Sequence, residues 1–377
     1  MIFDKHNNRL VSFDSVYKNS GDGMGNPVIK FVGVGGAGCH TVGRIKTKYE
    51  DKLKEIITVI MNTDRQDLNN CFADIKVQIG VETTKGRGAG TNPVVGFNSA
   101  MENVEDIRKV LEGTDLLFLT AGMGGGTGTG AAPIVAKIAK EMNILTIAMV
   151  ITPSKNQGKY CENNAEKGLM ELKKYADTVT VVSNSKVQDT FKAETTRVFY
   201  DGVDDIIYNS LMAVSDILLN VGEVNQDFAD LTMVVKGAGN LHIGIGNAKG
   251  KGALFEATKR ALENPIIDTR INGAKSIMVN VKGLEDRIII REVNECSEMI
   301  NQLVDPVCKS VATGIRYCTL NDKDVEVIII AGSFNENVDL NENNDDYDFD
   351  DDLYENKNND SKIEDNIDKL IPDYLQR

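Results

Sequence analysis

A glycine-rich segment limits the possible folds of this chain more than any other feature. Residues 120–130 read Thr-Ala-Gly-Met-Gly-Gly-Gly-Thr-Gly-Thr-Gly. The apolar run before them, residues 116–119, predicts a buried strand. Apolar residues at helical spacing follow them, with Pro133 where the first turn of a helix tolerates proline. Glycines between a strand and a helix let backbone amides converge at the helix N-terminus, so the segment predicts a phosphate-binding turn.

A flexible glycine linker is the alternative explanation of this segment. Linkers are rarely enclosed between a buried strand and a helix, so we favour the phosphate-binding turn. Thr127 and Thr129 add hydroxyl groups that could donate hydrogen bonds to phosphate.

Length and composition are those of a globular protein of about two domains. The chain has 377 residues, of which 41% are hydrophobic. It contains no run of about 18 apolar residues, and residues 1–26 lack the apolar core of a signal peptide, so we expect no membrane span and no direct membrane insertion. The six cysteines are scattered without a Cys-x-x-Cys pair, which is typical of reduced thiols in a cytoplasmic protein.

The negative charge of the chain is concentrated in its tail. The net charge is −14, and residues 335–377 contribute −11 from 15 acidic and 4 basic residues, which leaves −3 for the rest. A nucleic-acid-binding body should be basic, so we expect no nucleic-acid partner. High charge and few apolar residues predict a disordered linker over 333–365. Apolar character returns in 366–377, which favours a partner-docking peptide over a frayed end.

Alternating strand and helix patterns predict a parallel, doubly wound sheet. The expected strands are 28–34, 56–61, 75–79, 116–119, 144–151 and 178–182, and the expected helices begin near residue 39 and cover 95–111 and 169–175. Apolar residues then recur every three or four positions over 203–221, and Gly222 ends this long helix. Later strands at 242–246, 276–281 and 325–330 predict a smaller domain with its own sheet.

The expected fold class is therefore α/β: a doubly wound parallel-sheet domain that binds nucleotide, a long central helix, a smaller α+β C-terminal domain and a disordered acidic tail. The predicted boundaries are a flexible N-terminal extension over 1–27, the Rossmann-like domain over 28–200, the central helix over 201–222, the C-terminal domain over 223–332, the linker over 333–365 and the docking peptide over 366–377. The central helix should lie between the two domains.

Three glycine-rich turns bear on the kind of nucleotide. Residues 33–38 fit G-x-G-x-x-G after a strand, which is the dinucleotide fingerprint, and Asp64 follows the next strand as a possible ribose ligand. A dehydrogenase needs one such loop, whereas this chain has further glycine turns at 86–90 and 122–130. Three converging loops suit a nucleoside triphosphate better than a dinucleotide. The chain has no G-x-x-x-x-G-K-[ST] sequence, so it is not a P-loop protein.

At this point the residues resemble one family closely. Residues 124–130 resemble the signature of the tubulin/FtsZ superfamily, and with Ala121-Gly-Met before them and Ala131-Ala-Pro after them they resemble the FtsZ family in particular. Residues 33–38, 62–64, 84–93 and 225–230 agree with that family in order and spacing. The resemblance covers about residues 28–332 and, more weakly, the terminal peptide.

The resemblance implies a self-polymerising GTPase of cell division. It implies GTP and GDP as ligands, with Mg²⁺ bridging the phosphates, head-to-tail filaments of the chain with itself, and a place at the division site in the cytoplasm. The terminal peptide resembles the FtsZ segment that docks membrane tethers and division regulators. Its docking residues would be Leu370, Ile371, Pro372, Tyr374 and Leu375.

The resemblance also assigns a nucleotide-binding set. Its members are Gly35, Gly36, Ala37, Gly38, His40, Asp64, Ala89, Gly90, Asn92, Gly122, Gly124, Gly125, Gly126, Thr127, Gly128, Thr129, Gly130, Pro153, Gln157, Cys161, Tyr200, Asp204 and Asp205. Tyr200 stands where an aromatic ring stacks on guanine, and Asp204 and Asp205 stand where the base edge is read. A carboxylate suits the N1–H and 2-amino donors of guanine.

The segment Gly222-x-x-Asn225-x-Asp227-x-x-Asp230 follows the long helix. From the residues alone, Asp227 could cap the next helix with Asp230 in its first turn. The resemblance implies instead that Asp227 and Asp230, with Asn225 positioning the loop, orient a water against the nucleotide of the neighbouring subunit. Hydrolysis would then require a heterologous, open-ended contact between subunits.

Three positions depart from the family pattern. His40 replaces an asparagine, Gln157 replaces a glutamate, and Cys161 replaces an arginine whose bidentate fork a thiol does not supply. Two functions stay open: a working but divergent GTPase, which the retained Asn225, Asp227 and Asp230 favour, and a paralogue that binds nucleotide and copolymerises with little hydrolysis. An NAD(P)-dependent oxidoreductase built on residues 33–38 is a remote third.

Overall fold

The computed structural model describes residues 2–4, 26–192, 195–263, 271–310, 313–320 and 323–334. They belong to one compact unit, residues 1–334, whereas a second unit, residues 335–377, lies outside the described residues. The predicted docking peptide, and the acidic linker after its first two residues, therefore lie outside them as well.

The larger sheet has the strand order β1-β4-β3-β2-β5-β6-β7, and its neighbours are parallel except for β1 and β4. The strands are β1 (Ile2–Asp4), β2 (Ile29–Val34), β3 (Ile56–Asn62), β4 (Ile75–Gln78), β5 (Leu116–Gly122), β6 (Leu145–Thr152) and β7 (Thr178–Ser183). The predicted parallel sheet is confirmed. The direction of winding reverses between β2 and β5, and sheets of this kind bind ligands at the carboxyl ends of the strands at such a point.

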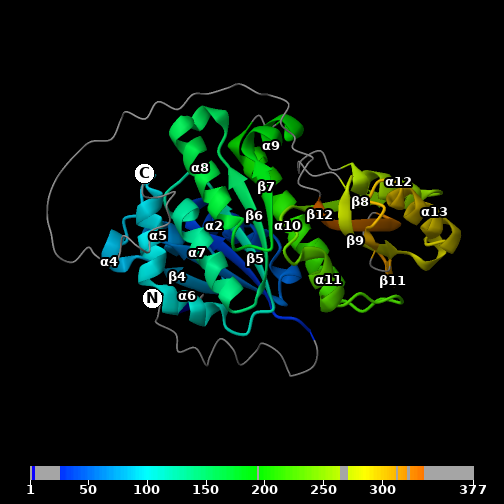
Figure 1. Cartoon of the computed structure of the whole chain (residues 1–377), viewed down its shortest axis with the longest axis horizontal. Helices are drawn as coiled ribbons and strands as arrows, with labels where there is room; N and C mark the ends of the chain where they lie inside the picture. The colour runs from blue at the N-terminus through cyan, green and yellow to red at the C-terminus, as the bar shows by residue number, and fades with distance from the viewer. Residues whose placement is uncertain are drawn as a thin grey trace. The chain divides into compact units, whose positions relative to one another are not determined.

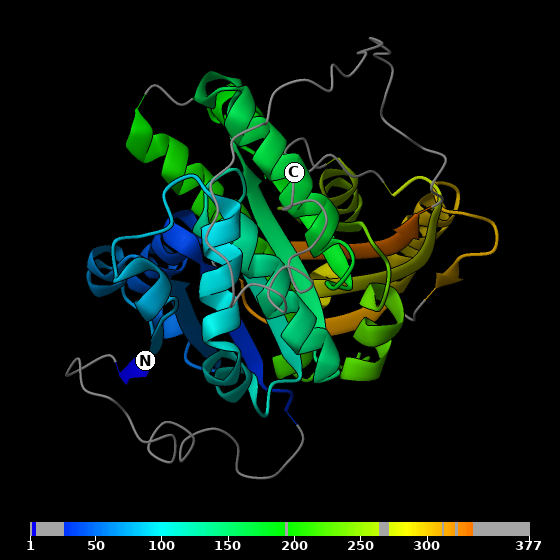
Figure 2. The same ribbon diagram turned by 60° about the vertical axis from the view of Figure 1, so that its left-hand side comes forward.

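Helices cover both faces of this sheet (Figures 1 and 2). They are α2 (Gly35–Lys48), α3 (Arg65–Asn70), α4 (Val81–Thr84), α5 (Pro93–Glu102), α6 (Val104–Leu111), α7 (Thr127–Glu141), α8 (Lys159–Leu172) and α9 (Asn184–Phe191), with short 3-10 turns η1 (Glu50–Lys52) and η2 (Lys155–Gln157). α7 packs against α5 and α8, and α2 packs against α10 (Thr196–Leu219). The central strands are buried on both faces, which explains their nearly continuous apolar sequences.

The long helix α10 lies between the larger sheet and a smaller one (Figure 1). The smaller sheet has the order β10-β9-β12-β8, with β11 paired to β9. This region contains α11 (Phe228–Val235), β8 (Leu241–Ala248), α12 (Ala253–Leu262), β9 (Ala274–Gly283), η3 (Glu285–Arg287), α13 (Ile290–Asn301), β10 (Lys309–Ser310), β11 (Gly314–Tyr317) and β12 (Val325–Phe334). Ile207 and Leu211 of α10 share one hydrophobic core with Phe31 of β2 and Ile328 of β12. The core therefore runs through α10 from one sheet to the other.

The predicted boundaries of three helices are wrong. α2 begins at Gly35 instead of near residue 39, and α7 begins at Thr127, so Pro133 lies inside the helix and not in its first turn. Glycine has a low helix propensity, so a run of glycines conceals a helix start from sequence analysis. The central helix covers 196–219 instead of 201–222, and it ends before Gly222.

Three other segments differ from expectation. The single helix predicted over 95–111 is two helices, separated at Asn103, whose side chain accepts a hydrogen bond from Gly80 N at 2.8 Å. The helix predicted over 169–175 is the end of α8, whose mostly polar first half lacks a clear apolar stripe. Ile2–Asp4 form β1 on β4, so the prediction of a loose extension is wrong for these residues. An open strand edge accepts any short extended segment.

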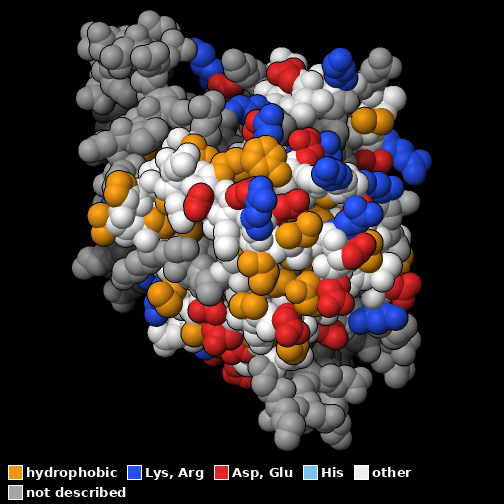
Figure 3. Space-filling view, turned by 90° about the vertical axis from the view of Figure 1, so that its right-hand side faces the viewer, with side chains coloured by type: hydrophobic (Ala, Val, Ile, Leu, Met, Phe, Trp, Pro, Cys, Tyr) orange, Lys and Arg blue, Asp and Glu red, His pale blue; other side chains and the backbone are white. Residues whose placement is uncertain are grey.

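Two surface properties bear on the expected partners. Figure 3 shows one face of the molecule, on which acidic, basic and hydrophobic side chains are interspersed. Nucleic-acid binding needs positive charge gathered on one surface, and the described side chains of this face are mixed instead. Among the described residues, no helix combines the length and the apolar content that a bilayer crossing requires.

Candidate functional site

Two helices begin at the carboxyl ends of the central strands without a side-chain cap. α2 starts directly after β2, and α7 starts after the glycine loop that follows β5. Val34 and Gly126 hold the two N-cap positions, and neither provides a side-chain hydrogen bond. The first backbone N–H groups of a helix have no partner within the helix, and they lie at the positive end of its dipole. An anion between the two helix starts would satisfy them.

Two kinds of glycine surround these helix starts. At Gly35 (φ +74°) a Cβ atom would lie 2.7 Å from Gly128 N, and at Gly128 it would lie 2.3 Å from Gly122 O. These glycines are needed because the two backbones touch. At Gly125 and Gly90 a Cβ atom would meet nothing within 4 Å. These two border open space, which is the room that a bound phosphate chain needs.

The other predicted phosphate-binding residues lie on the same three segments. Gly36, Ala37 and Gly38 form the first turn of α2, Gly124 and Gly126 stand in the loop before α7, Gly130 lies in the first turn of α7, and Ala89 and Asn92 flank Gly90. The N–H group of Gly126 donates to Gly90 O at 3.1 Å. Asn92 caps α5 by accepting a hydrogen bond from Val94 N at 3.0 Å. The three glycine loops therefore lie side by side. We call these loops, residues 33–38, 86–92 and 122–130, the glycine cradle.

Side chains in the glycine cradle bond mostly to the protein itself. The hydroxyl oxygens of Thr127 and Thr63 lie 2.7 Å apart, and Gly124 N donates to Thr129 Oγ1 at 2.9 Å. The two threonines predicted as phosphate donors therefore also brace the loop. Asn62 Nδ2, at the end of β3, is buried and has no partner among the described atoms. A phosphate oxygen is the kind of acceptor that this amide lacks.

Two predicted nucleotide contacts have partners near α3. Asp64, expected at the ribose, caps α3 by accepting hydrogen bonds from Gln66 N at 2.8 Å and Asp67 N at 3.2 Å. His40 Nδ1 lies 3.5 Å from Cys71 Sγ, and His40 Nε2 lies 3.6 Å from an Asp67 carboxylate oxygen. His40 is therefore oriented by α3, where the family pattern has an asparagine.

Pro153 and Cys161 border the glycine cradle, whereas Gln157 bonds within its own turn. A Cβ atom at Gly124 would lie 2.8 Å from Cys161 O and 3.3 Å from Pro153 Cγ. Gln157 Oε1 accepts a hydrogen bond from Ser154 N at 2.9 Å, which caps η2. Gln157 and Cys161 thus supply no charge to this edge of the cradle.

Asn164 in α8 is a residue of the cradle that the sequence analysis missed. Its side chain is buried, and Nδ2 donates to Thr91 O at 3.1 Å and Gly124 O at 3.4 Å. Asn164 therefore ties two glycine loops together. It was missed because it lies in the polar half of α8, which was not predicted as helix.

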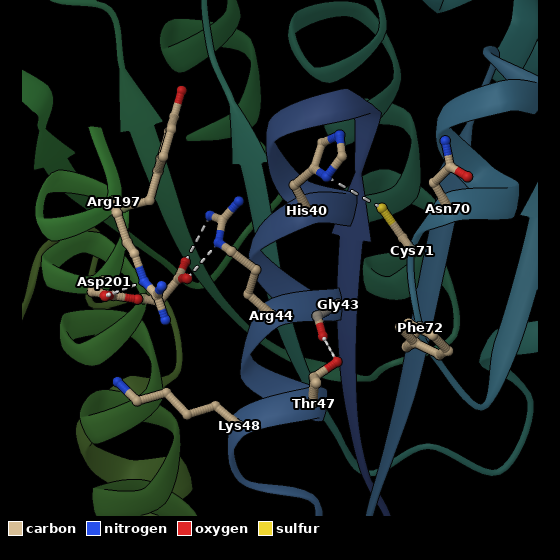
Figure 4. Close-up of a pocket in the computed structure, with 12 residues that line it drawn as sticks. His40, Gly43, Arg44, Thr47, Lys48, Asn70, Cys71, Phe72, Arg197 and Asp201 are labelled. Atoms are coloured by element: carbon tan, nitrogen blue, oxygen red, sulfur yellow. Dashed lines mark hydrogen bonds and ion pairs between the residues drawn. The ribbon is translucent and has the colours of Figure 1, made fainter. Parts of the chain in front are cut away.

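A pocket of about 510 Å³ opens between α2, the end of α3 and the start of α10 (Figure 4). It is lined by His40, Tyr200 and Asp204, which were predicted to contact the nucleotide, and by Arg44, which was not. Arg44 Nε and Nη2 donate to the two Asp204 carboxylate oxygens at 2.5 and 2.9 Å, and Arg44 Cζ lies 4.9 Å from the centroid of the Tyr200 ring. Arg44 stands one helical turn after His40, and this spacing was the signal that could have identified it.

The two carboxylates expected to read the base already have protein partners. The Asp204 side chain is only 3% exposed, and burial raises the pKa of its carboxyl group, while the hydrogen bonds and the charge of Arg44 act in the opposite direction. Asp205 accepts hydrogen bonds from Lys48 Nζ at 2.7 Å and Tyr49 OH at 2.9 Å. Of the two, Asp204 lines the pocket and Asp205 is not among its lining residues, and both already accept hydrogen bonds from the protein.

The predicted catalytic segment lies beyond the other end of α10, whose 24 residues span roughly 36 Å. Asp227 and Asp230 form a capping box at the start of α11: Asp227 Oδ1 accepts from Asp230 N at 2.9 Å, and Asp230 Oδ2 accepts from Asp227 N at 3.0 Å. The helix-capping explanation is confirmed. Each carboxylate has a second oxygen outside the capping box, so capping leaves room for another role.

The loop that carries these residues is anchored to the smaller sheet. Asn225 Oδ1 accepts a hydrogen bond from Gly222 N at 3.2 Å, which closes the loop on itself. Gln226 is buried, donates to Val279 O at 3.0 Å and accepts from Asn280 Nδ2 at 3.2 Å. We call residues 222–230 the acidic loop. Its conformation is held by β9 and does not depend on the glycine cradle.

Metal-binding side chains do not gather in the described part of the chain. No three His, Cys, Asp or Glu residues there are grouped in a way that could hold a metal ion. The six cysteines are free thiols in the structure. Magnesium at nucleotide sites is held largely by phosphate oxygens and waters, so a Mg²⁺ ion bound with the nucleotide fits this arrangement.

Comparisons with known proteins agree with this geometry. The family described as "Tubulin/FtsZ family, GTPase domain" matches residues 28–192, and "FtsZ family, C-terminal domain" matches residues 239–335. Cell division protein FtsZ 1 of Thermococcus kodakarensis is 37% identical over 303 residues, which is 80% of each chain. An FtsZ dimer structure from M. jannaschii aligns with a TM-score of 0.72 and 32% identity, over 86% of this chain and 92% of that one. A CetZ2 protofilament structure from Haloferax volcanii has a TM-score of 0.69 and 21% identity, over 82% and 94%, and shows a shared fold.

Proposed function

The chain belongs to the FtsZ family of tubulin-like GTPases, and from that premise we propose that it polymerises head to tail and hydrolyses GTP at the contact between subunits. One observation carries the proposal. The glycine cradle and the acidic loop lie near opposite ends of α10, so a single chain holds the two halves of a hydrolytic site far apart.

The phosphates of GTP would bind in the glycine cradle. The uncapped starts of α2 and α7 supply backbone N–H donors, and Gly90 and Gly125 border the open space that the phosphates would fill. The buried Asn62 amide, which has no partner among the described atoms, is a further donor within the same region. Mg²⁺ bound with the nucleotide would neutralise part of the phosphate charge.

The acidic loop would act on the nucleotide of the next subunit. Asp227 and Asp230 each keep one carboxylate oxygen outside the capping box, and a carboxylate at this position can accept a proton from a water that attacks the γ-phosphate. Asn225 and the buried Gln226 would hold the loop for this contact. The capping box fixes the direction of both acids before the subunits meet, which lowers the entropy cost of positioning them.

Such a contact joins one surface of a subunit to a different surface of the next copy, and a heterologous contact of this kind builds open filaments. The M. jannaschii relative forms a dimer, and the Haloferax volcanii CetZ2 structure is a protofilament. Both assemblies support the proposal that this chain associates with itself. The relatives named as cell division proteins support a role in a division ring at the division site.

A second function has an observation of its own in its favour. At the edge of the cradle, Gln157 bonds within its turn and Cys161 provides no cationic fork. A paralogue that binds nucleotide and joins filaments with little hydrolysis would tolerate this loss. We favour the hydrolysing form because Asn225, Asp227 and Asp230 keep a geometry in which both acids retain a carboxylate oxygen outside the capping box.

The terminal peptide is proposed as the docking site for a membrane tether or a division regulator. Leu370, Ile371, Pro372, Tyr374 and Leu375 form its apolar set, at the end of an acidic segment that would act as a leash. Deletion of residues 366–377 should leave polymerisation in solution unchanged and abolish recruitment to the division site. Recruitment of the shortened chain would rule out this role.

The proposed function is tested by phosphate release from the purified chain over a range of protein concentrations, with electron microscopy of the same samples. We expect turnover to rise more steeply than linearly with protein concentration and filaments to form with GTP. Negligible turnover together with GTP-dependent filaments would favour the second function. Turnover at full specific rate in a dilute, monomeric sample would contradict the shared site.

A further inference from the structure

Arg44 covers the carboxylate that was expected to read the base. The Arg44 side chain is 36% exposed and the Asp204 side chain is 3% exposed, and the two form a bidentate ion pair. Figure 4 shows the Arg44 guanidinium extending from α2 into the pocket, joined by two dashed lines to a carboxylate of α10. The group that meets the open pocket is therefore the guanidinium, and the carboxylate lies behind it.

The guanidinium has donors left after it binds Asp204. Arginine carries five N–H donors. One from Nε and one from Nη2 go to Asp204, and Nη2 also lies 3.4 Å from Thr41 Oγ1. The structure assigns no hydrogen-bond acceptor to Nη1 among the described residues, so its two donors are available to a ligand.

The position of Arg44 also fits the expected place of a base. Arg44 follows His40 by one turn on the pocket face of α2, and α2 begins at the glycine cradle. The Tyr200 ring is 48% exposed, and Arg44 Cζ lies 4.9 Å from its centroid. The guanidinium lies over one face of the ring, so a base that stacks on the part of that face left uncovered would meet the guanidinium with its edge.

We propose that Arg44 is the residue that selects guanine, by donating to O6 and N7 of the base, and that Asp204 is a positioning residue that holds the guanidinium. This inference rests on the proposed function, because it requires GTP in the glycine cradle. Nε and one Nη2 donor are used by Asp204, so the two donors of Nη1 are the ones that would face the O6 and N7 acceptors of guanine, whereas adenine presents an amino group in place of O6. The ion pair with the buried Asp204 fixes the Arg44 guanidinium in one orientation, so little conformational freedom is lost when the base binds.

The expected alternative is direct reading by Asp204 or Asp205, and the two modes of recognition use different atoms of the base. If the carboxylate reads the base, it uses N1–H and the 2-amino group. If Arg44 reads the base, it uses O6 and N7. ITP lacks the 2-amino group and keeps O6 and N7, whereas 7-deaza-GTP keeps the 2-amino group and lacks N7. The two analogues therefore separate the two modes of recognition.

The test is competition of GTP, ITP and 7-deaza-GTP against a fluorescent GTP analogue on the full chain, below the concentration at which it polymerises. We expect ITP to bind within about twofold of GTP and 7-deaza-GTP to bind roughly tenfold or more weakly, which is the loss of one charge-assisted hydrogen bond. Weak ITP with normal 7-deaza-GTP, or equal binding of all three, would overturn the role of Arg44 and leave the proposed function standing. No GTP binding at all would overturn both.

Two arginine variants complete the test. Arg44→Lys keeps the charge beside Asp204 and removes the fork, so we expect GTP to bind as weakly as 7-deaza-GTP and the difference between them to vanish. Arg108→Lys is the matched control, because Arg108 on α6 is also an arginine in an ion pair, with Glu141, but does not line the pocket. It should bind all three nucleotides like the parent chain. If Arg44→Lys folds like the parent in a thermal melt and still discriminates against 7-deaza-GTP, the assignment is wrong.

Discussion

The two ends of α10 are built in opposite ways. Near the start of α10, the glycine cradle consists largely of residues without side chains, so two helix N-termini and three loops can surround an anion. Beyond its end, the acidic loop is made of side chains that already serve the chain itself, as a capping box and as an anchor to β9. The backbone N–H groups at the two helix starts of the cradle have no side-chain cap, and a bound anion would satisfy them. The side chains of the loop already have hydrogen-bond partners within the chain.

This difference shows which parts of a site between two subunits can be recognised in the structure of one subunit alone. An unsatisfied helix start or a glycine beside open space indicates a ligand directly. A carboxylate that caps a helix gives no sign of a second role, because its local hydrogen bonds account for it. The catalytic role that we propose for the acidic loop rests only on its distance from the cradle and on the family to which the chain belongs.

The largest expected effect separates the two kinds of glycine in the cradle. Gly128→Ala places a methyl group 2.3 Å from a backbone oxygen, so we expect a loss of about 3 kcal/mol or more in the free energy of unfolding, together with loss of GTP binding. Gly125→Ala meets nothing within 4 Å, so it should fold normally and still lose GTP affinity, because the methyl group enters the phosphate space. Denaturant unfolding and nucleotide binding measure both. Normal GTP affinity in Gly125→Ala would break the account of the cradle.

The next effect separates capping from catalysis in the acidic loop. Serine also caps helices but carries no carboxylate, so Asp227→Ser should keep the stability of the chain and lower GTP turnover by roughly 10²–10⁴-fold. Asp227→Ala should lose the same turnover and about 1 kcal/mol of stability as well. Both variants should bind GTP like the parent chain. If Asp227→Ser turns over GTP at the parent rate, Asp227 only caps α11.

A smaller effect is expected from the anchor of the loop. Gln226→Leu removes the hydrogen bonds to Val279 and Asn280, so the loop should lose its fixed direction and turnover should fall by roughly tenfold, with GTP binding unchanged. The buried partners left behind should lower stability by about 1–3 kcal/mol. Asn280→Ala is the matched variant, and the double variant should cost less than the sum of the two because they share a hydrogen bond. Unchanged turnover in Gln226→Leu would mean that the anchor has no part in positioning.

The smallest effect contrasts two lysines, the buried Lys30 on β2 and the half-buried Lys282 on β9. Burial lowers the pKa of Lys30, on the strand that leads into the cradle, from 10.5 to about 8. For Lys282, on β9, burial acts in the same direction, but Glu326 and Asp216 reverse it and the pKa is raised above 10.5. The folded chain therefore binds fewer protons at Lys30 than the unfolded chain between about pH 8 and 10.5, so the Lys30 contribution to stability rises with pH in that window.

The measurement is the unfolding free energy of the parent chain minus that of Lys30→Met. We expect this difference to rise by about 2 kcal/mol between pH 8 and 10.5. The same difference for Lys282→Met should stay flat over that window, since a raised pKa contributes stability that is lost only above the unfolded pKa of 10.5. A flat curve for Lys30 would mean that its ammonium is not penalised by burial.

Most of the fold could be predicted because it depends on regular patterns. The buried strands are continuous apolar runs, and the apolar spacing of α10 is helical throughout. The predictions fail where local sequence pattern does not decide the structure. α2 and α7 begin inside glycine runs, which have low helix propensity, and β1 forms only because β4 offers an open edge.

The candidate site could be predicted only where backbone geometry defines it. The glycines of the cradle are identifiable because they form runs next to strands and helices, and at Gly35 and Gly128 close backbone contacts allow no side chain. Side-chain roles were harder, because they depend on residues distant in the sequence. Asp204 lies 160 residues from Arg44, and Gln226 lies 53 residues from Val279. Neither of these two pairings could be identified from the sequence. Asn164 was hidden in a helix whose polar half gave no signal.

The central claim is that one subunit holds the nucleotide and its neighbour supplies the acids. The most direct test mixes two inactive variants, Asp227→Ala, which keeps an intact cradle, and Gly125→Ala, which keeps an intact acidic loop. Each alone should release little phosphate, and the mixture should regain turnover because the cradle of one variant meets the loop of the other. A mixture that stays as inactive as its components, although the two variants associate, would contradict the shared site.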